Sequence, residues 1–319
     1  MKPIAQLHQP VMLERAIELL GVSLSKPGAV LVDGTLGLGG HAEAFLRKFP
    51  ELTLIGIDRD QNALRLAGER LAEFADRIHL VHAVYSEILD VVEELGFDSV
   101  QAILLDLGVS SMQLDEAERG FAYSFDAPLD MRMDASSRLT AAEILNRYEE
   151  RDLVRIFKEY GEERYSAAIA KQIVTERVSE PFVTSARLAA LIVKKVPFIP
   201  GKSTGHPAKR VFQALRIEVN GELETLRETM PAAIEALGVG GRILVMSYHS
   251  LEDRIVKQAL SAAATSSAPI DLPIELPEHA PVLRILTKGA ESASSAESAS
   301  NPRANSVKVR AAEKIRMAA

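Results

Sequence analysis

Short apolar segments alternate with helical patterns in the first third of the chain, and this alternation restricts the fold more than any other feature. Aliphatic runs typical of buried strands lie at residues 29–32, 52–57, 78–81 and 100–105. Apolar residues at helical spacing separate these runs, for example at residues 61–74 and 87–95. Alternation of this kind predicts an α/β fold in which helices cover both faces of a mostly parallel sheet.

The strand pattern stops after Leu107 and returns at residues 242–246. In between, only helical patterns are found, at residues 141–145, 152–160, 165–178, 184–195 and 208–219. We therefore predict a sheet domain in two parts, residues 1–107 and 208–319, interrupted by an inserted all-helical domain at residues 108–207.

Three smaller expectations concern the two ends of the sheet domain. A helix at residues 11–20 should end at Gly21, because glycine is a common C-terminal cap. Two strand-like runs near the end, 282–287 and 306–311, have no crossover helix between them and predict an antiparallel last strand. The stretch of Glu, Ser and Ala between these runs predicts a disordered loop at residues 289–303.

Composition limits the chemistry and the partners. The chain has no cysteine, which excludes disulfides, thiolate metal sites and cysteine nucleophiles, and we predict no metal site. A net charge of −7 does not favour general attraction to nucleic acid, so such a partner would need a local basic patch. Residues 194–216 contain six Lys and Arg residues and no acid, which indicates either a phosphate-binding surface, with Phe198 and Phe212 to stack on bases, or a solvated charged face.

The apolar segments are too short for a membrane span, which needs about 20 residues. Charged residues at Glu14, Arg15 and Glu18 also interrupt the N-terminal apolar stretch, so that it lacks the core of a signal peptide. We therefore expect a cytoplasmic protein with no membrane partner.

A glycine-rich turn at residues 33–41 joins the first strand to the next helix. Gly37, Gly39 and Ala42 fit the pattern G-x-G-x-x-A of a dinucleotide site, and Asp58 follows about 20 residues later, at the end of the second strand. A carboxylate in that place accepts hydrogen bonds from ribose hydroxyls. NAD and S-adenosylmethionine share this ribose, so the turn alone leaves both open.

Three residues near the strand ends favour S-adenosylmethionine. Asp33 would repel a pyrophosphate but suits the ammonium and sulfonium groups of a methionine moiety. Asp106 ends the fourth strand, at the edge where open α/β sheets bind ligands, and Tyr85 follows the third strand, where it can stack on adenine. Each residue alone is equally compatible with a structural role as a cap or in the core. Together they predict a methyl donor site.

Eight motifs in order along the chain carry a specific resemblance. They are HQPVML at 8–13, VDGTLGLGGH at 32–41, IDRD at 57–60, LLDLGVSS at 104–111, ERGF at 118–121, LDMRMD at 129–134, HPAKRVFQALRI at 206–217 and SYHSLEDR at 247–254. In these motifs the chain resembles the bacterial ribosomal small-subunit RNA (cytidine-N4) methyltransferase family, RsmH or MraW, over nearly its whole length.

The resemblance implies a class I S-adenosylmethionine-dependent methyltransferase fold, which is Rossmann-like with an antiparallel last strand, and an insert that recognises the substrate. It also implies N4-methylation of a P-site cytidine in the decoding centre of 16S ribosomal RNA, within the small ribosomal subunit. Carried over by position, the residues that would contact the cofactor are Gly39, Gly40, His41, Asp58, Tyr85, Asp106 and Gln113.

The missing cysteine narrows the chemistry to an acceptor that the substrate already carries, such as the N4 amine of cytosine. We expect Asp106, with carbonyl groups of the turn after it, to accept hydrogen bonds from this amine. His249 is a second catalytic candidate, which would bring Tyr248 or its own imidazole to the base, or would only cap the following helix. His8 either closes over the site or has a structural role.

Two other functions fit a fold of this class. One is an NAD-linked dehydrogenase, because the glycine turn alone does not separate the two cofactors. The other is a non-catalytic ribosome-binding protein, because a fold does not by itself prove an activity. The oligomeric state leaves no signal in the sequence.

Overall fold

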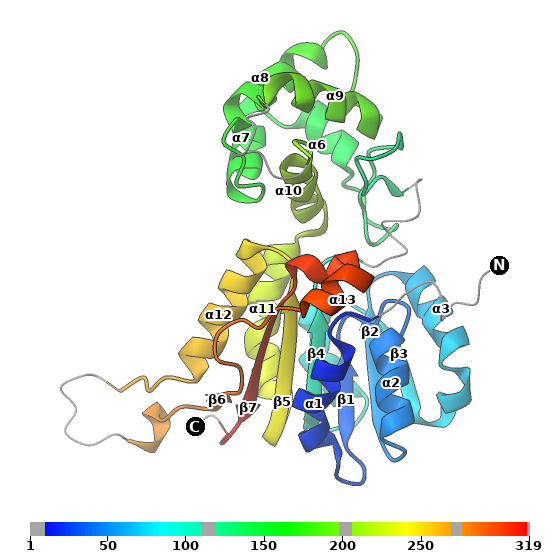
Figure 1. Cartoon of the computed structure of the whole chain (residues 1–319), viewed down its shortest axis with the longest axis vertical. Coiled ribbons are helices and arrows are strands. Elements are labelled where there is room, and N and C mark those ends of the chain that lie inside the picture. The colour runs from blue at the N-terminus through cyan, green and yellow to red at the C-terminus, as the bar shows by residue number, and fades with distance from the viewer. Residues whose placement is uncertain (1–9, 110–118, 198–205, 269–275, 318–319) are drawn as a thin grey trace. The chain divides into compact units, whose positions relative to one another are not determined.

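The computed structural model describes residues 10–109, 119–197, 206–268 and 276–317, and the chain forms two compact units (Figure 1). The sheet unit consists of Met1–Gly108 and Leu223–Ala319, and the helical unit consists of Val109–Glu222. The insert therefore ends later than the predicted residue 207. The physical reason is that Val211, Phe212 and Leu215 of the last inserted helix pack into the apolar core of the helical unit.

The sheet unit contains one seven-stranded sheet, in the order β3-β2-β1-β4-β5-β7-β6. The strands are β1 Val30–Asp33, β2 Thr53–Asp58, β3 Ile78–His82, β4 Val100–Asp106, β5 Leu237–Ser247, β6 Leu283–Ile285 and β7 Lys308–Lys314. Strands β1 to β5 pair in parallel, whereas β7 pairs antiparallel with both β5 and β6. The predicted parallel sheet with an antiparallel last strand is confirmed.

The register of the parallel strands brings three acidic residues to one edge of the sheet. Asp33, the last residue of β1, pairs with Gly56 of β2 and with Leu104 of β4. Asp58 and Asp106 each lie two residues beyond these partners, at the ends of their strands. The carboxyl edge of β1, β2 and β4 is thus lined by the three acids that the sequence pattern singled out.

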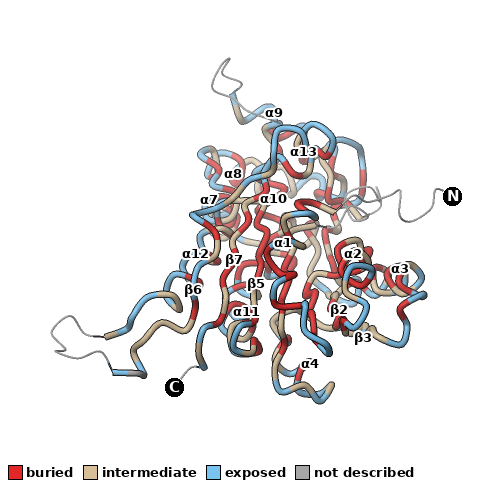
Figure 2. Tube along the Cα trace, turned by 60° about the horizontal axis from the view of Figure 1, so that its bottom comes forward, coloured by how far each residue is buried: buried red, intermediate tan, exposed pale blue. Residues whose placement is uncertain are grey.

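Helices cover both faces of the sheet (Figure 1). In the sheet unit they are α1 Leu13–Leu24, α2 Gly40–Lys48, α3 Gln61–Arg70, α4 Ile88–Glu94, α11 Glu222–Ala236, α12 Ser250–Ala263 and α13 Ser295–Ser300, with 3-10 turns at η2 Ala72–Arg77, η3 Tyr85–Glu87, η5 Pro277–His279 and η6 Pro302–Ser306. Helices α1, α2 and α3 contribute to one buried apolar cluster, and α4, α11 and α12 to another. Figure 2 shows β5 and β7 as buried between these layers. Burial on both faces explains the continuous apolar runs in the sequence.

Two local predictions in the sheet unit are wrong. Helix α1 does not end at Gly21 but continues to Leu24. Gly21 is buried, and a Cβ atom there would lie 3.0 Å from the ring of Phe49, so the glycine serves close packing instead of capping.

Residues 289–303, predicted to be disordered, contain helix α13 and the start of η6. Ser294 caps α13 by accepting a hydrogen bond from the backbone of Glu297 (3.1 Å). The carboxylate of Glu297 accepts the backbone N–H of Met12 (2.6 Å), and Glu291 forms an ion pair with Arg15 (2.7 Å). These contacts attach the segment to the start of α1. They explain why it is ordered although its content of Glu, Ser and Ala predicts disorder.

The helical unit is built from α6 Ala141–Arg147, α7 Glu150–Glu159, α8 Ser166–Glu176, α9 Ser185–Lys195 and α10 Lys209–Asn220. Its core is apolar and includes Leu145, Phe157, Ile173 and Ile192, all fully buried. In the part of the chain that the structure describes, no helix has the length and apolar character that crossing a membrane requires.

Candidate active site

At Gly34, the glycine turn has no room for a side chain. The backbone N–H of Gly34 donates to the carbonyl of Leu104 in β4 (3.0 Å). A Cβ atom on Gly34 would lie 2.6 Å from the side chain of Leu105 and 3.3 Å from Cβ of Tyr85, so a larger residue would displace the turn. Gly39 has a φ angle of 71° and precedes the first residue of α2. The turn thus lies close to both β4 and Tyr85, the residue predicted to stack on adenine.

Asp58 fastens the glycine turn to the end of β2. One carboxylate oxygen accepts the backbone N–H of Gly37 (2.8 Å), and the other accepts that of Asp60 (2.8 Å). Burial raises the pKa of Asp58 to about 6, although these two hydrogen bonds favour its ionised form. A carboxylate oxygen accepts two hydrogen bonds, so both oxygens retain capacity for ribose hydroxyls.

Asp33 is a buried acid next to other acids. Its side chain accepts the backbone N–H of Thr35 (3.1 Å), and the residue is only 2% exposed. Burial, together with the charges of Asp106 and Asp58, raises the pKa of Asp33 to about 7, although His41 and the hydrogen bond from Thr35 act in the opposite direction. A cation placed at this edge would relieve the repulsion between the carboxylates, whereas a pyrophosphate would add to it.

Asp106 receives contacts from three other elements. Its Oδ1 atom accepts the hydroxyl of Tyr248, which follows β5, at 2.6 Å. Its Oδ2 atom lies 3.8 Å from Nδ1 of His41 in α2. Its backbone N–H donates to the hydroxyl of Thr35 in the glycine turn (2.7 Å). Burial raises the pKa of Asp106, against the effects of His41 and of the Tyr248 hydrogen bond.

His41 links the site to the segment before α1. The ring is buried, and its Nε2 atom lies 2.9 Å from the carbonyl oxygen of Val11, so Nε2 carries a proton and donates it. Pro10 lies against the start of α2, since a Cβ atom on Gly40 would be 2.8 Å from its ring. Two of the residues predicted to touch the cofactor, Gly40 and His41, therefore also hold residues 10–11 beside the glycine turn.

His249 makes the helix-capping contacts that the sequence offered as the alternative to catalysis. Its Nδ1 atom accepts the backbone N–H of Glu252 in α12 (3.4 Å), and its Nε2 atom lies 3.2 Å from the carboxylate of that residue. The same carboxylate accepts the backbone N–H groups of Tyr248 (2.8 Å) and His249 (3.1 Å). Tyr248, not the imidazole, is the residue of this motif that reaches Asp106.

The structure brings six of the predicted site residues to the glycine turn and the carboxyl edge of the sheet: Gly39, Gly40, His41, Asp58, Tyr85 and Asp106. Gln113, His8 and Phe198 lie outside the described residues. Sequence reasoning missed Thr35, which carries no signal beyond its place two residues after Asp33. It named Tyr248 only as an alternative, although the tyrosine follows a buried strand at this same edge.

In the helical unit, the prediction that Phe212 stacks on bases of the RNA is wrong. Phe212 is only 3% exposed and packs edge-on against Tyr123, with 5.7 Å between ring centroids, so it is not available to stack on a base. His206 is exposed, and its ring stacks on that of Tyr123 with 4.7 Å between the ring centroids. Of the basic residues of the patch that the structure describes, four are exposed, namely Lys194, Lys195, Lys209 and Arg210, and Lys202 lies outside the described residues. Arg216 instead forms an ion pair with Glu222 (2.8 Å).

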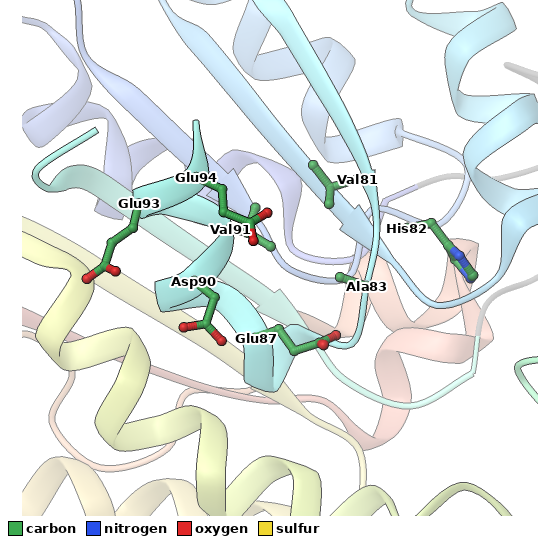
Figure 3. Close-up of a pocket in the computed structure, with 8 residues that line it drawn as sticks. All are labelled: Val81, His82, Ala83, Glu87, Asp90, Val91, Glu93 and Glu94. Atoms are coloured by element: carbon green, nitrogen blue, oxygen red, sulfur yellow. The ribbon is translucent and has the colours of Figure 1, made fainter. Parts of the chain in front are cut away.

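A cleft of about 410 Å³ lies between the end of β3 and helix α4 (Figure 3). Its polar lining consists of His82 and four acids, Glu87, Asp90, Glu93 and Glu94. None of the three acids at the strand ends is among its lining residues. The negative lining does not suit a polyanion, so we do not assign this cleft to RNA.

Comparison with known proteins separates the two cofactors, S-adenosylmethionine and NAD, that the glycine turn alone leaves open. The chain matches the MraW methylase family over residues 5–315. It belongs to that family. The protein named ribosomal RNA small subunit methyltransferase H from Nocardia farcinica is 60% identical over 314 residues, which cover 98% of this chain and 97% of the relative. A relative of the same name from Saccharopolyspora erythraea is 59% identical over 311 residues, which cover 98% of this chain and 94% of the relative.

Membership of this methylase family makes S-adenosylmethionine the cofactor and removes the dehydrogenase alternative. The predicted class I methyltransferase fold is confirmed as well. The residues at the sheet edge fit the cofactor, because the buried carboxylate of Asp33 and the partly buried carboxylates of Asp58 and Asp106 form a site that favours a cation. The backbone at Gly34 lies close to Tyr85, since a Cβ atom on this glycine would be 3.3 Å from that of the tyrosine.

Proposed function

We propose that this methylase transfers a methyl group to the exocyclic N4 amine of a P-site cytidine in 16S ribosomal RNA, acting in the cytoplasm on the small ribosomal subunit. The name of the relatives supports the choice of ribosomal RNA. The observation that carries the choice of an amine is Asp106, a partly buried carboxylate at the sheet edge in a chain without cysteine. Such an edge offers a proton acceptor and no nucleophile that adds to a pyrimidine ring.

The proposed cofactor residues are Gly39, Gly40, His41, Asp58, Tyr85, Asp106 and Gln113. Asp58 has spare acceptor capacity for the ribose, and Tyr85 lies beside the turn at Gly34, where an adenine ring would stack. Asp33 and Asp106 supply negative charge for the sulfonium and ammonium groups.

The reaction needs alignment and one proton acceptor. When bound, S-adenosylmethionine supplies a methyl carbon that bonds to N4 as the carbon–sulfur bond breaks and leaves its electron pair on sulfur. The N4 lone pair is delocalised into the cytosine ring, so the carboxylate of Asp106 must hold the amine in line by accepting one of its N–H groups. The same carboxylate then takes the proton that N4 loses, and this general-base step is worth typically about 10²–10⁴-fold in rate.

We assign recognition of the RNA to the helical unit. Lys194 and Lys195 end helix α9, and Lys209 and Arg210 begin helix α10, where all four are exposed. Exposed cations bind phosphates without reading the sequence, whereas the stacked pair of His206 and Tyr123 offers a flat aromatic surface to an unpaired base.

The decisive experiment is methylation of small ribosomal subunits from cells that lack the enzyme. Purified protein and labelled S-adenosylmethionine should restore one methyl group, and mass spectrometry of nucleosides and RNA fragments should place it on N4 of a single cytidine. A methyl group on carbon 5, on another base or at scattered positions would overturn the proposal. Restoration of no methyl group would favour the non-catalytic ribosome-binding protein. Free 16S RNA in a parallel reaction identifies which form is the substrate.

A further inference from the structure

The two carboxylate oxygens of Asp106 have different surroundings. Oδ1 accepts a short hydrogen bond of 2.6 Å from the hydroxyl of Tyr248. Oδ2 faces Nδ1 of His41 at 3.8 Å, which is beyond hydrogen-bonding distance. Among the described residues, the carboxylate therefore accepts a side-chain hydrogen bond at Oδ1 alone.

Both the backbone and the side chain of Tyr248 are held in place. Its backbone N–H donates to Glu252 (2.8 Å), which fixes the turn between β5 and α12. Its ring packs against the apolar cluster of α1 and α2 and lies beside the chain at Gly108, where a Cβ atom would be 3.5 Å away. Burial and the neighbouring carboxylate of Asp106 raise the pKa of the Tyr248 hydroxyl far above neutrality. The hydroxyl thus keeps its proton throughout the physiological range and acts only as a donor.

We propose that Tyr248 is a positioning residue for methyl transfer, which engages Oδ1 of Asp106 so that Oδ2 faces the acceptor amine. The inference rests on the proposed function. Within that function, Tyr248 orients the carboxylate and Asp106 accepts the proton. When N4 gains the methyl group, its proton passes to Oδ2 of Asp106, which becomes a neutral carboxylic acid and later releases the proton to water. Tyr248 gains and loses no proton in this sequence.

The groups that face Asp106 determine how the removal of this hydroxyl will act. His41 from α2 and the Tyr248 hydroxyl favour the ionised carboxylate, whereas burial and the charge of Glu252 from α12 disfavour it. Asp33 from β1 adds a like charge. In Tyr248→Phe one of the two favourable contacts is lost, so the pKa of Asp106 rises. Because Asp106 acts as a base in its ionised form, the acid limb of the pH profile should move to higher pH.

The test compares wild type with Tyr248→Phe in the methylation of small subunits across the pH range. We expect kcat at neutral pH to fall about 10- to 100-fold. The acid limb should move up by about one pH unit, and affinity for S-adenosylmethionine should stay within about twofold of wild type. Tyr148→Phe is the matched control, because Tyr148 in the helical unit also donates its hydroxyl to a carboxylate, that of Glu218 (3.1 Å). This control should leave the pH profile unchanged.

A loss of activity without movement of the acid limb would overturn the positioning role, because misfolding or poor packing lowers kcat at every pH alike. Full activity with an unmoved limb would overturn it too. A direct measurement separates this result from failure of the proposed function. NMR titration of labelled aspartate, assigned with Asp106→Asn, reports the pKa of Asp106 even if wild type methylates no cytidine. A raised pKa in Tyr248→Phe supports the contact, and an unchanged pKa refutes it.

Discussion

The sheet unit and the helical unit use charge in opposite ways. In the sheet unit, Asp33, Asp58 and Asp106 are gathered at one edge, where burial raises their pKa values. In the helical unit the core is apolar, and basic residues such as Lys194 and Lys209 are exposed to solvent. Buried groups with shifted pKa values mark sites of chemistry, whereas exposed charge suits reversible binding of a polyanion. The difference supports our proposal that one unit transfers the methyl group and the other recognises the RNA.

The strongest way to break this comparison is to remove the proposed base. Asp106→Asn should lower kcat for methyl transfer by about 10²–10⁴-fold, because the amide accepts a hydrogen bond but takes no proton at neutral pH. Binding of RNA should be unchanged, as measured by filter binding with whole subunits. If kcat stays within about threefold of wild type, the chemistry does not depend on this edge and the assignment of roles fails.

The next largest effect concerns stability as a function of pH. Burial raises the pKa of Asp33 from 3.8 to about 7, so between these values the folded chain holds a proton that the unfolded chain has released. Stability therefore falls as the pH rises through this window. Asp33→Asn has no such carboxyl, so the variant should gain about 1–3 kcal/mol over wild type between pH ~4 and pH ~8. Urea unfolding without cofactor at both pH values measures this difference.

Asp253 provides a control of opposite sign. Burial disfavours its ionisation, but the hydrogen bonds and charges of Arg310 (2.8 Å) and Lys308 (3.4 Å) outweigh burial and lower its pKa. Its contribution to stability is therefore present at neutral pH and lost as the pH falls. Asp253→Asn should lose stability relative to wild type at neutral pH and much less at low pH. The same direction of change in both variants would contradict the argument.

The helical unit gives the third test. Lys194→Ala with Lys195→Ala should weaken RNA binding about tenfold and lower the slope of log K against log salt by about 1–2. Affinity for S-adenosylmethionine, measured by calorimetry, should not change. The double variant Lys158→Ala with Lys171→Ala removes two exposed lysines from α7 and α8 of the same unit and serves as the control. Equal losses in both double variants would mean that only total charge matters.

The smallest effect is expected for a charge pair of the sheet unit that does not lie among the three acids. Glu291 and Arg15 are joined by two hydrogen bonds (2.7 and 2.9 Å), but about 30% of each side chain is exposed. Glu291→Gln should therefore cost only about 0.5–1 kcal/mol in stability, with normal methyl transfer. Thermal unfolding and the subunit assay check both points. A large loss of activity would show that the comparison between buried and exposed charge is too simple.

The sheet and its three acids were predictable because both depend on local patterns. Apolar runs mark strands buried on two faces, and parallel strands bring their carboxyl ends to one edge, so residues 58 and 106 had to lie near Asp33. The contact between Tyr248 and Asp106 was not predictable in the same way. It requires that β5 lies next to β4 and that the tyrosine ring spans the gap, and neither follows from spacing along the chain.

Other differences arise where tertiary contacts outweigh local signals. Gly21 has the character of a helix cap, but the ring of Phe49 needs its small volume and the helix continues. Residues 295–300 have a composition typical of disorder, yet Glu297 binds the backbone of Met12 and helps to hold this segment. Phe212 follows two basic residues and suggests a base-stacking surface, but the apolar core of the helical unit buries it.

The order of the strands also has a consequence for how the protein is made. Strand β6 precedes β7 in the chain, yet it pairs with β7 alone, and β7 also covers the outer edge of β5. As the ribosome synthesises the chain, β5 and β6 emerge before the strand that joins them. Until β7 follows, the edge of β5 is open to pairing with other chains. The nascent enzyme thus passes through a period of aggregation risk that ends only when β7 has been added.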